Sequence, residues 1–151
     1  MAEENFIIKD NILIKYTGNK TNIIIPDKVK IIDDNAFWCC YDITSVTIPD
    51  SVTSIGEGAF YTCINLKYIH ISNSIRHINY ETFAYCISLK DISLPDSITS
   101  IDRQAFRDSN ITDMKVKDQK IHDPKGLIKK SDGSFKVKVQ NKLSSLGIQI
   151  T

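Results

Sequence analysis

Cysteine is the residue type in this 151-residue chain with the widest chemical range, because a thiolate can serve as nucleophile, metal ligand or disulfide partner. Cys40, Cys63 and Cys86 recur every 23 residues, and each follows a phenylalanine by three residues. Cys39 lies outside this column and is expected to be more exposed. Neither a Cys-x-x-Cys pair nor a His/Cys cluster at zinc spacing occurs. The spacing therefore favours buried, apolar roles over metal binding, with a disulfide between stacked cysteines as an alternative in an oxidising compartment.

Histidine and serine side chains are the other groups that could support catalysis. The chain has three histidines, His70, His77 and His122. A nucleophile needs a base within hydrogen-bond reach and an oxyanion site, and no Gly-x-Ser-x-Gly or comparable segment is present. Gly56-Glu57-Gly58 lacks the third glycine and the strand-loop-helix setting of a phosphate-binding loop. The sequence therefore predicts no enzyme, no catalytic residue, no cofactor and no metal ion.

Composition and charge narrow the class of protein further. Hydrophobic residues make up 42% of the chain and charged residues 25%, as in an ordinary globular protein. The formal net charge of +1 gives no overall field for attracting nucleic acid or an anionic membrane, so binding of a polyanion would have to be local, for example by the basic segment 117–151. We expect neither nucleic acid nor a small-molecule substrate as the partner. No stretch approaches the roughly 18 apolar residues of a membrane span, and the first residues lack the features of a signal peptide. We expect one folding unit without a membrane span and, on this ground alone, a cytoplasmic location.

An internal repeat of 23 residues dominates the sequence. Four copies occupy residues 25–47, 48–70, 71–93 and 94–116, and the last is one residue short after its phenylalanine. Apolar residues of the copies fall into columns: Ile25, Ile48, Ile71 and Leu94; Val29, Val52, Ile75 and Ile98; Ile32, Ile55, Ile78 and Ile101; Phe37, Phe60, Phe83 and Phe106; Ile43, Leu66, Leu89 and Ile111; Val46, Ile69, Ile92 and Met114. One unit cannot bury its apolar face alone, whereas stacked units bury a continuous core, so the repeat predicts a solenoid.

Each copy also contains the pattern of a short strand followed by a turn. In Val46-Thr47-Ile48 the flanking apolar residues point inward and the middle one outward, since side chains alternate along a strand. Pro49-Asp50 then ends the strand, because proline cannot donate to a sheet ladder. A second short segment, residues 51–55, returns along the opposite wall, and residues 57–60 have room for about one helical or 3₁₀ turn. The predicted fold class is mainly β with short helical or 3₁₀ turns.

The pattern Ile-Pro-Asp-Ser-Val-x-x-Ile-x-x-x-Ala-Phe-x-x-Cys, which begins at Ile48, resembles the BspA-like class of leucine-rich repeats. The match covers about residues 22–116, with departures at Ser72-Asn73, at Thr82 and in the short fourth copy. The resemblance implies a right-handed leucine-rich-repeat solenoid that serves as a binding scaffold, in proteins commonly linked with adhesion at the cell surface. It implies no catalytic residues.

The segments outside the four copies in 25–116 are expected to be terminal caps, because an open solenoid would expose strand edges and apolar cross-sections. Residues 1–24 predict an N-terminal hairpin-like cap with strands at 6–9 and 12–16. A third strand-like run at 22–25 then feeds the first coil.

The C-terminal segment, residues 117–151, predicts a C-terminal cap or basic tail, since it carries 8 basic and 3 acidic side chains. Strand-like runs at 127–130 and 135–140 flank a turn signal and predict a hairpin. The alternation Lys136-Val137-Lys138-Val139 predicts a strand whose lysines face water. Residues 141–151 show no clear period.

The outward strand positions form the candidate protein-binding site, because neighbouring coils place them about 4.8 Å apart on one wall without a role in the core. These positions are Ser45, Thr47, Tyr68, His70, Asp91, Ser93, Asp113 and Lys115. Tyr68 beside His70 supplies the amphipathic aromatic character common in interfaces, and Lys67 and Lys90 flank the wall where the strands begin. The predicted function is non-enzymatic binding of a protein ligand, at the cell surface by resemblance, with an intracellular scaffold or adaptor as the alternative.

Overall fold

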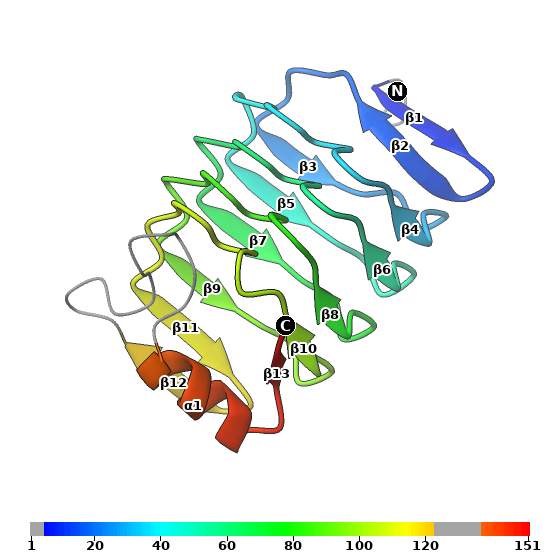
Figure 1. Ribbon diagram of the computed structural model, residues 1–151. Coiled ribbons are helices and arrows are strands. Elements are labelled where there is room, and N and C mark those ends of the chain that lie inside the picture. The colour runs from blue at the N-terminus through cyan, green and yellow to red at the C-terminus, as the bar shows by residue number, and fades with distance from the viewer. Residues whose placement is uncertain (1–4, 123–136) are drawn as a thin grey trace.

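The computed structural model describes residues 5–122 and 137–151, which wind into a stack of similar coils (Figure 1). One strand from each coil contributes to a front wall, formed by β3 (Asn22–Ile24), β5 (Ser45–Thr47), β7 (Tyr68–His70), β9 (Asp91–Ser93) and β11 (Asp113–Val116). The opposite side is a return wall, formed by β2 (Ile12–Tyr16), β4 (Ile31–Ile32), β6 (Ser54–Ile55), β8 (His77–Ile78), β10 (Ser100–Ile101) and β13 (Gln149–Ile150). The predicted solenoid is confirmed.

Residues that pair between neighbouring coils are one repeat, or 23 residues, apart in the sequence. On the front wall Ser45 pairs with Tyr68 in a parallel ladder, and on the return wall Ile31 pairs with Ser54. Each residue therefore lies beside its equivalent in the next coil. The front strands are short because a turn follows at once: the amide of Val52 donates to the carbonyl oxygen of Pro49 at 3.1 Å.

The apolar columns of the repeat fill the interior between the two walls. Every column member is buried except Ile69, which is partly buried. The four phenylalanines stack along one axis, with ring centroids 4.9, 5.5 and 5.4 Å apart and interplanar angles of 7–9°. The ring of Tyr16 continues this stack, 5.5 Å from the ring of Phe37. Buried aromatic surface therefore links every coil to the next.

A run of β-turns, rather than a helical or 3₁₀ turn, connects the return wall to the front wall. Bonds from residue i+3 back to i occur, such as the amide of Trp38 to the carbonyl oxygen of Asn35 at 3.0 Å. Residues with a positive φ interrupt this run of turns at two equivalent positions of the coils. The first position holds Asn35, Gly58 and Glu81, and the second holds Cys39, Thr62, Tyr85 and Asp108. A right-handed helical turn cannot propagate through a positive φ, which explains the difference from the prediction.

The ladder of strands is interrupted at one level of the stack. The front wall consists of the sheets β3-β5-β7 and β9-β11-β12, and the return wall also divides, between β6 and β8. Both interruptions separate the same two coils. At the start of the turn between them, Ser72-Asn73 replaces Pro-Asp, and the buried hydroxyl of Ser72 donates to the carbonyl oxygen of Val52 at 3.3 Å. The turn side stays continuous here, because the amide of Phe60 donates to the carbonyl oxygen of Thr82 at 3.0 Å.

The N-terminal segment forms a hairpin that continues the return wall. β1 (Phe6–Lys9) pairs with β2 in antiparallel fashion, so the two strands lie where the sequence predicts them. Asp10 and Asn11 make the connection with φ values of 51° and 63°, as a two-residue hairpin turn requires. β2 then pairs in parallel with β4.

The C-terminal segment differs from the prediction. β12 (Gln119–His122) forms a hairpin with β11 through left-handed Lys117 and Asp118. The hairpin expected farther on is wrong from residue 137, because α1 (Val137–Ser145) is a helix there, and its remaining residues lie outside the described ranges. The strand with water-facing lysines expected at 136–139 is likewise a helix from residue 137 on, and residue 136 lies outside the described ranges.

The helical spacing of two apolar residues explains this difference. Val139 and Leu143 are four residues apart and both are buried, so one helix face packs on the core. Gly147, with a φ of 79°, ends the helix, and the amide of Ile148 donates back to the carbonyl oxygen of Leu143 at 3.0 Å. The chain then adds β13 beside β10 on the return wall.

Candidate functional site

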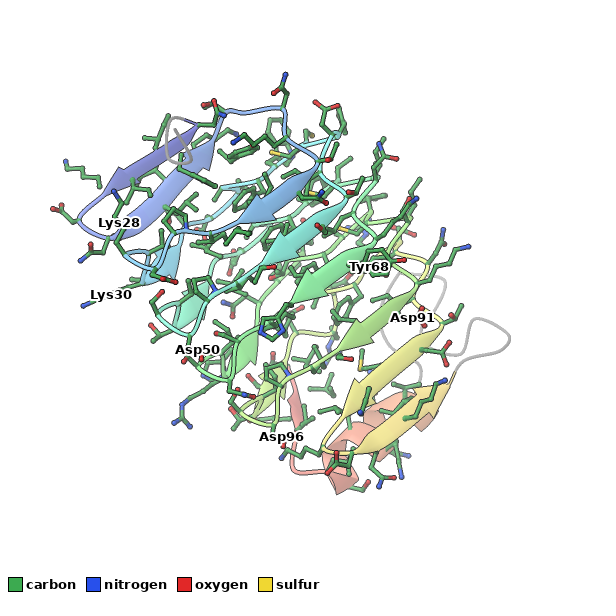
Figure 2. All side chains as sticks on the ribbon, turned by 180° about the vertical axis from the view of Figure 1, so that it is seen from behind. Lys28, Lys30, Asp50, Tyr68, Asp91 and Asp96 are labelled. Carbon is green, nitrogen blue, oxygen red and sulfur yellow. The ribbon has the colours of Figure 1, made fainter. Side chains whose placement is uncertain are left out.

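The eight predicted binding positions lie on the front wall in two columns. Ser45, Tyr68, Asp91 and Asp113 form the first column, and Thr47, His70, Ser93 and Lys115 form the second. Six of the eight side chains are exposed, and Ser45 and Asp113 are partly buried. Figure 2 shows this wall, with Tyr68 and Asp91 near the beginnings of neighbouring strands. The structure therefore brings the predicted residues onto one surface.

Two further residues extend these columns toward the N-terminus. In β3, Asn22 pairs with Ser45 and Ile24 with Thr47, and the side chain of Ile24 is 75% exposed. The hydroxyl of Ser45 donates to Oδ1 of Asn22 at 2.7 Å. The sequence does indicate that these two residues belong to a front-wall strand, because Pro26 follows this strand as Pro49 follows the next one. Counting the repeats from Ile25 placed both residues outside the first copy.

At its other end the front wall continues into β12. Lys120 lies opposite Lys115 in the antiparallel pair, and its Nζ is 3.6 Å from Oδ1 of Asp113. Asp113, a predicted binding residue, therefore forms an ion pair with a lysine of the neighbouring strand β12. The periodic pattern ends at Val116, so sequence analysis could not place this lysine on the wall.

Charged side chains line both edges of the front wall. Lys67 and Lys90 lie at the edge where the strands begin, which we call the leading edge. Asp27, Asp50 and Asp96 lie in the turns that follow the strands, at the trailing edge, where Lys28 and Lys30 also lie. Figure 2 shows Asp50 and Asp96 on the side of the wall opposite Tyr68 and Asp91.

Each edge is also hollowed. A groove of about 510 Å³ at the leading edge is lined by Lys67, Tyr68, Ile87, Lys90 and Asp91 among others. A second groove, of about 420 Å³, lies at the trailing edge beside Asp27, Asp50 and His70. Both are open surface depressions, suited to contact with a macromolecule rather than enclosure of a small substrate.

Hydrogen bonds between coils hold the floor of the leading-edge groove. The side-chain amide of Asn65 donates to the carbonyl oxygen of Tyr41 at 2.7 Å, and the hydroxyl of Ser88 donates to that of Ile64 at 2.6 Å. Asn110 donates to the carbonyl oxygen of Ile87 at 2.8 Å. These three residues occupy equivalent positions in successive coils, so one polar column ties the coils together beside the wall.

The cysteine column lies in the interior, as the spacing predicts for Cys63 and Cys86, whereas Cys40 is only partly buried. Burial raises the pKa of the Cys63 thiol, raises that of Cys86 to about 12 and raises that of Cys40 to about 11. These thiols stay protonated at neutral pH, and a protonated thiol is neither a nucleophile nor a metal ligand. Cys39 is partly buried and therefore more exposed than the interior pair.

The remaining candidate groups do not converge. His70 lies on the front wall and His77 on the return wall, where Nδ1 of His77 is 2.5 Å from Oγ of Ser100. Within residues 5–122 and 137–151, no group of three or more His, Cys, Asp or Glu side chains is arranged to hold a metal ion. Over the same ranges, no helix combines the length and apolar character needed to cross a membrane.

Comparison with solved structures finds several bacterial leucine-rich-repeat proteins. A leucine rich cell surface protein from Faecalibacterium prausnitzii is 35% identical, with a TM-score of 0.67 over 74% of this chain and 33% of its own. This chain therefore spans about a third of that protein. A leucine-rich repeat protein from Bacteroides capillosus is 29% identical, with a TM-score of 0.64 over 74% and 92% of the two chains.

A leucine-rich repeat protein from T. pallidum shares the fold over 97% of this chain and 94% of its own, with a TM-score of 0.56 and 17% identity. No curated protein matches the chain.

The sequence model of the BspA type leucine rich repeat region matches residues 7–125 in six copies. This range extends beyond the four copies counted above, and it includes β2, β3 and β12, which continue the stack at its two ends. The match, together with the similarity to the F. prausnitzii protein, confirms the predicted resemblance: the chain belongs to the BspA-type leucine-rich-repeat family.

Proposed function

We propose that the chain is a non-enzymatic protein-binding module and that the front wall is its binding surface. The observation that carries this proposal is the alignment of outward side chains in two columns, free of any role in the core. Leucine-rich-repeat solenoids generally use such extended surfaces for interaction. Tyr68, 71% exposed at the middle of the wall, is the aromatic side chain best placed to anchor a partner.

The rigidity of the wall supports this proposal. The stacked phenylalanines and the parallel ladders fix the backbone of each front strand before any partner arrives. A preformed surface loses little conformational entropy on binding, so more of the contact energy contributes to affinity.

The segments on either side of the four copies are the proposed caps of the stack. We propose that residues 1–24 cap the first of the four copies in 25–116 and that residues 117–151 cap the last. The antiparallel β1–β2 and β11–β12 hairpins support the proposal, because each replaces a further parallel coil with a strand running the other way.

More specifically, we propose that the binding module acts in adhesion at the cell surface. The name of the F. prausnitzii protein supports it, because that protein is described as a cell surface protein. An intracellular scaffold or adaptor is the alternative, and the four free cysteines favour it, since reduced thiols are typical of a reducing compartment. Fractionation of cells that naturally produce the protein, with and without protease added outside, separates the two: only a surface protein loses its signal on protease treatment.

Affinity capture with matched variants tests the binding surface. The wild-type chain and a Tyr68→Ala/His70→Ala variant are immobilised and exposed to extracts and surface fractions of the producing cells. The control, Tyr80→Ala/His77→Ala, removes the same residue types from exposed positions away from the front wall. We expect proteins retained by the wild type and the control to be lost by the front-wall variant. Equal retention by all three would contradict the proposal.

A further inference from the structure

The leading-edge groove combines exposed apolar surface with positive charge. The side chains of Tyr68 and Ile87 line it and are 71% and 45% exposed. Lys67 and Lys90, which also line it, are equivalent residues of adjacent coils and lie side by side. Within residues 5–122 and 137–151, the acidic side chain that lines this groove is Asp91.

This groove spans the two coils between which the strand ladder is interrupted. Lys67 and Tyr68 come from one coil, and Ile87, Lys90 and Asp91 from the next. Beneath it Ser88 and Asn110 each donate a hydrogen bond to the backbone of the preceding coil. The partly buried side chain of Ile69 adds apolar surface at the same level of the wall.

Lys67 and Lys90 place two positive charges in the lining of the groove. A segment lying across the front wall meets two lysines at the leading edge, whereas the trailing edge mixes acidic with basic side chains, such as Asp50 and Lys30 (Figure 2). Acidic groups on a partner are therefore attracted to the two lysines of the groove. Two lysines beside the carboxylate of Asp91 are too few to follow a phosphate backbone, so the arrangement favours a peptide over a nucleic acid.

We propose that the leading-edge groove binds an extended acidic peptide segment of the partner protein, with one aromatic or branched aliphatic residue packed between Tyr68 and Ile87. Carboxylates on either side of this anchor pair with Lys67 and Lys90. The inference rests on the proposed function and names the chemistry of the partner at that surface. The apolar anchor supplies affinity, and the two lysines select acidic sequences.

The test uses a displayed library of random 12-residue peptides, selected against three forms of the whole chain. These are the wild type, Lys67→Glu/Lys90→Glu, and the control Lys9→Glu/Lys30→Glu, which makes the same change in net charge at exposed lysines away from the groove. Figure 2 shows Lys30 at the edge opposite Tyr68. Thermal melting of each form checks that it is folded.

We expect selection on the wild type and the control to enrich peptides with Asp or Glu beside an aromatic or aliphatic residue, and selection on the groove variant not to. For a synthetic peptide from the enriched set, the groove variant should bind at least about tenfold more weakly, and Tyr68→Ala should weaken binding by a similar factor. Raising the salt concentration should weaken wild-type binding, because the lysines at the rim are screened.

Several results would overturn the inference: enrichment of neutral or basic peptides, equal enrichment on the groove variant, or no enrichment on the wild type. Tighter, lysine-dependent binding of a 12-nucleotide single-stranded DNA would overturn it in favour of a nucleic-acid ligand. The affinity capture with Tyr68→Ala/His70→Ala is read separately. If the front-wall variant loses its partners in that capture while the peptide selection fails, the front wall remains the proposed binding surface. Only the assignment of an acidic peptide to the groove is then rejected.

Discussion

The thiol of Cys86 donates a hydrogen bond to the carbonyl oxygen of Phe60, which lies one coil away, with an Sγ to O distance of 3.1 Å. Cys63 makes the equivalent bond to Phe37, also at 3.1 Å. Each buried thiol thus gives a polar partner to the backbone of the preceding coil. Ser109 takes the same position in the last copy, but its hydroxyl donates within its own coil, to the carbonyl oxygen of Phe106 at 2.8 Å. Cys63 and Cys86 therefore tie coils together.

Alkali should weaken the fold through these thiols. Burial raises the pKa of Cys86 from its ordinary value of 9.0 to about 12, so the folded state holds its proton where the unfolded state loses it. The contribution of the protonated Cys86 thiol to the free energy of unfolding is therefore fully present below pH 9, and it is lost as the pH rises toward 12. Urea unfolding of the wild type and of Cys63→Ser/Cys86→Ser across this range measures it. A wild-type curve no steeper in pH than that of the double variant would refute the assignment.

Removal of one phenylalanine from the stack should destabilise the protein strongly. Phe60 is fully buried and its ring lies 4.9 and 5.5 Å from the rings on either side. Phe60→Ala empties that site and should lower the free energy of unfolding by roughly 3 to 5 kcal/mol. Tyr68→Ala, at an exposed position, should change it by less than about 0.5 kcal/mol. Denaturant titration of both variants compares them, and equal midpoints would contradict the interior position of Phe60.

At Thr62 the ordinary preference for alanine over glycine should reverse. Thr62 has a φ of 59°, a left-handed conformation that is costly for a β-branched residue, and its amide donates to the carbonyl oxygen of Ala84 at 2.9 Å. Thr62→Gly should therefore be more stable than Thr62→Ala by about 1 kcal/mol, because only glycine adopts this φ without steric cost. Chemical denaturation of the two variants decides the order. Greater stability of the alanine variant would show that the turn relaxes to a negative φ.

The sequence predicted the parts of the fold that repeat. A residue such as Phe83 is placed by its equivalents at Phe60 and Phe106, because stacking enforces the same environment in each coil. The outward direction of Tyr68 and His70 follows from the same alternation. These conclusions need only periodicity, and they required no knowledge of neighbouring segments.

Features that depend on a neighbour outside the period escaped prediction. Val139 alternates with lysines as in a strand, but the packing of Val139 and Leu143 on the end of the core selects a helix. Lys120 reaches Asp113 only because a hairpin turn at Lys117-Asp118 brings β12 back beside β11. The interruption of the ladder likewise depends on how two whole coils fit together, which no single column reveals.

Leu143 should be essential to the C-terminal end of the stack. Its side chain is fully buried, and its carbonyl oxygen accepts the bond from Ile148 that ends α1. Leu143→Ala should lower the free energy of unfolding by about 2 to 4 kcal/mol through the cavity that it leaves. Lys142→Ala, the exposed neighbour in the same helix, should have an effect below about 0.5 kcal/mol. Similar melting temperatures for the two variants would indicate that α1 does not pack on the core.

The interruption of the ladder should appear as locally fast hydrogen exchange. In the coil before it the amide of Ile48 donates to the carbonyl oxygen of His70 at 3.0 Å, and in the coil after it the amide of Leu94 donates to that of Lys115 at 2.8 Å. The equivalent bond from Ile71 to Ser93 is absent between these described coils, which lie on either side of the break.

On the return wall the side-chain amide of Asn79 donates to the carbonyl oxygen of Ile55 at 2.7 Å, where the coils above and below use backbone amides. The coils at the break are thus joined by packing, by the turn side and by side-chain bonds such as those of Ser72 and Ser88, but not by strand ladders, and should separate more readily than others. We expect the amide of Ile71 to exchange at least about tenfold faster than those of Ile48 and Leu94 under native conditions. Residue-resolved exchange measured by NMR provides the comparison, and uniform protection of the three amides would show that the ladder is continuous in solution.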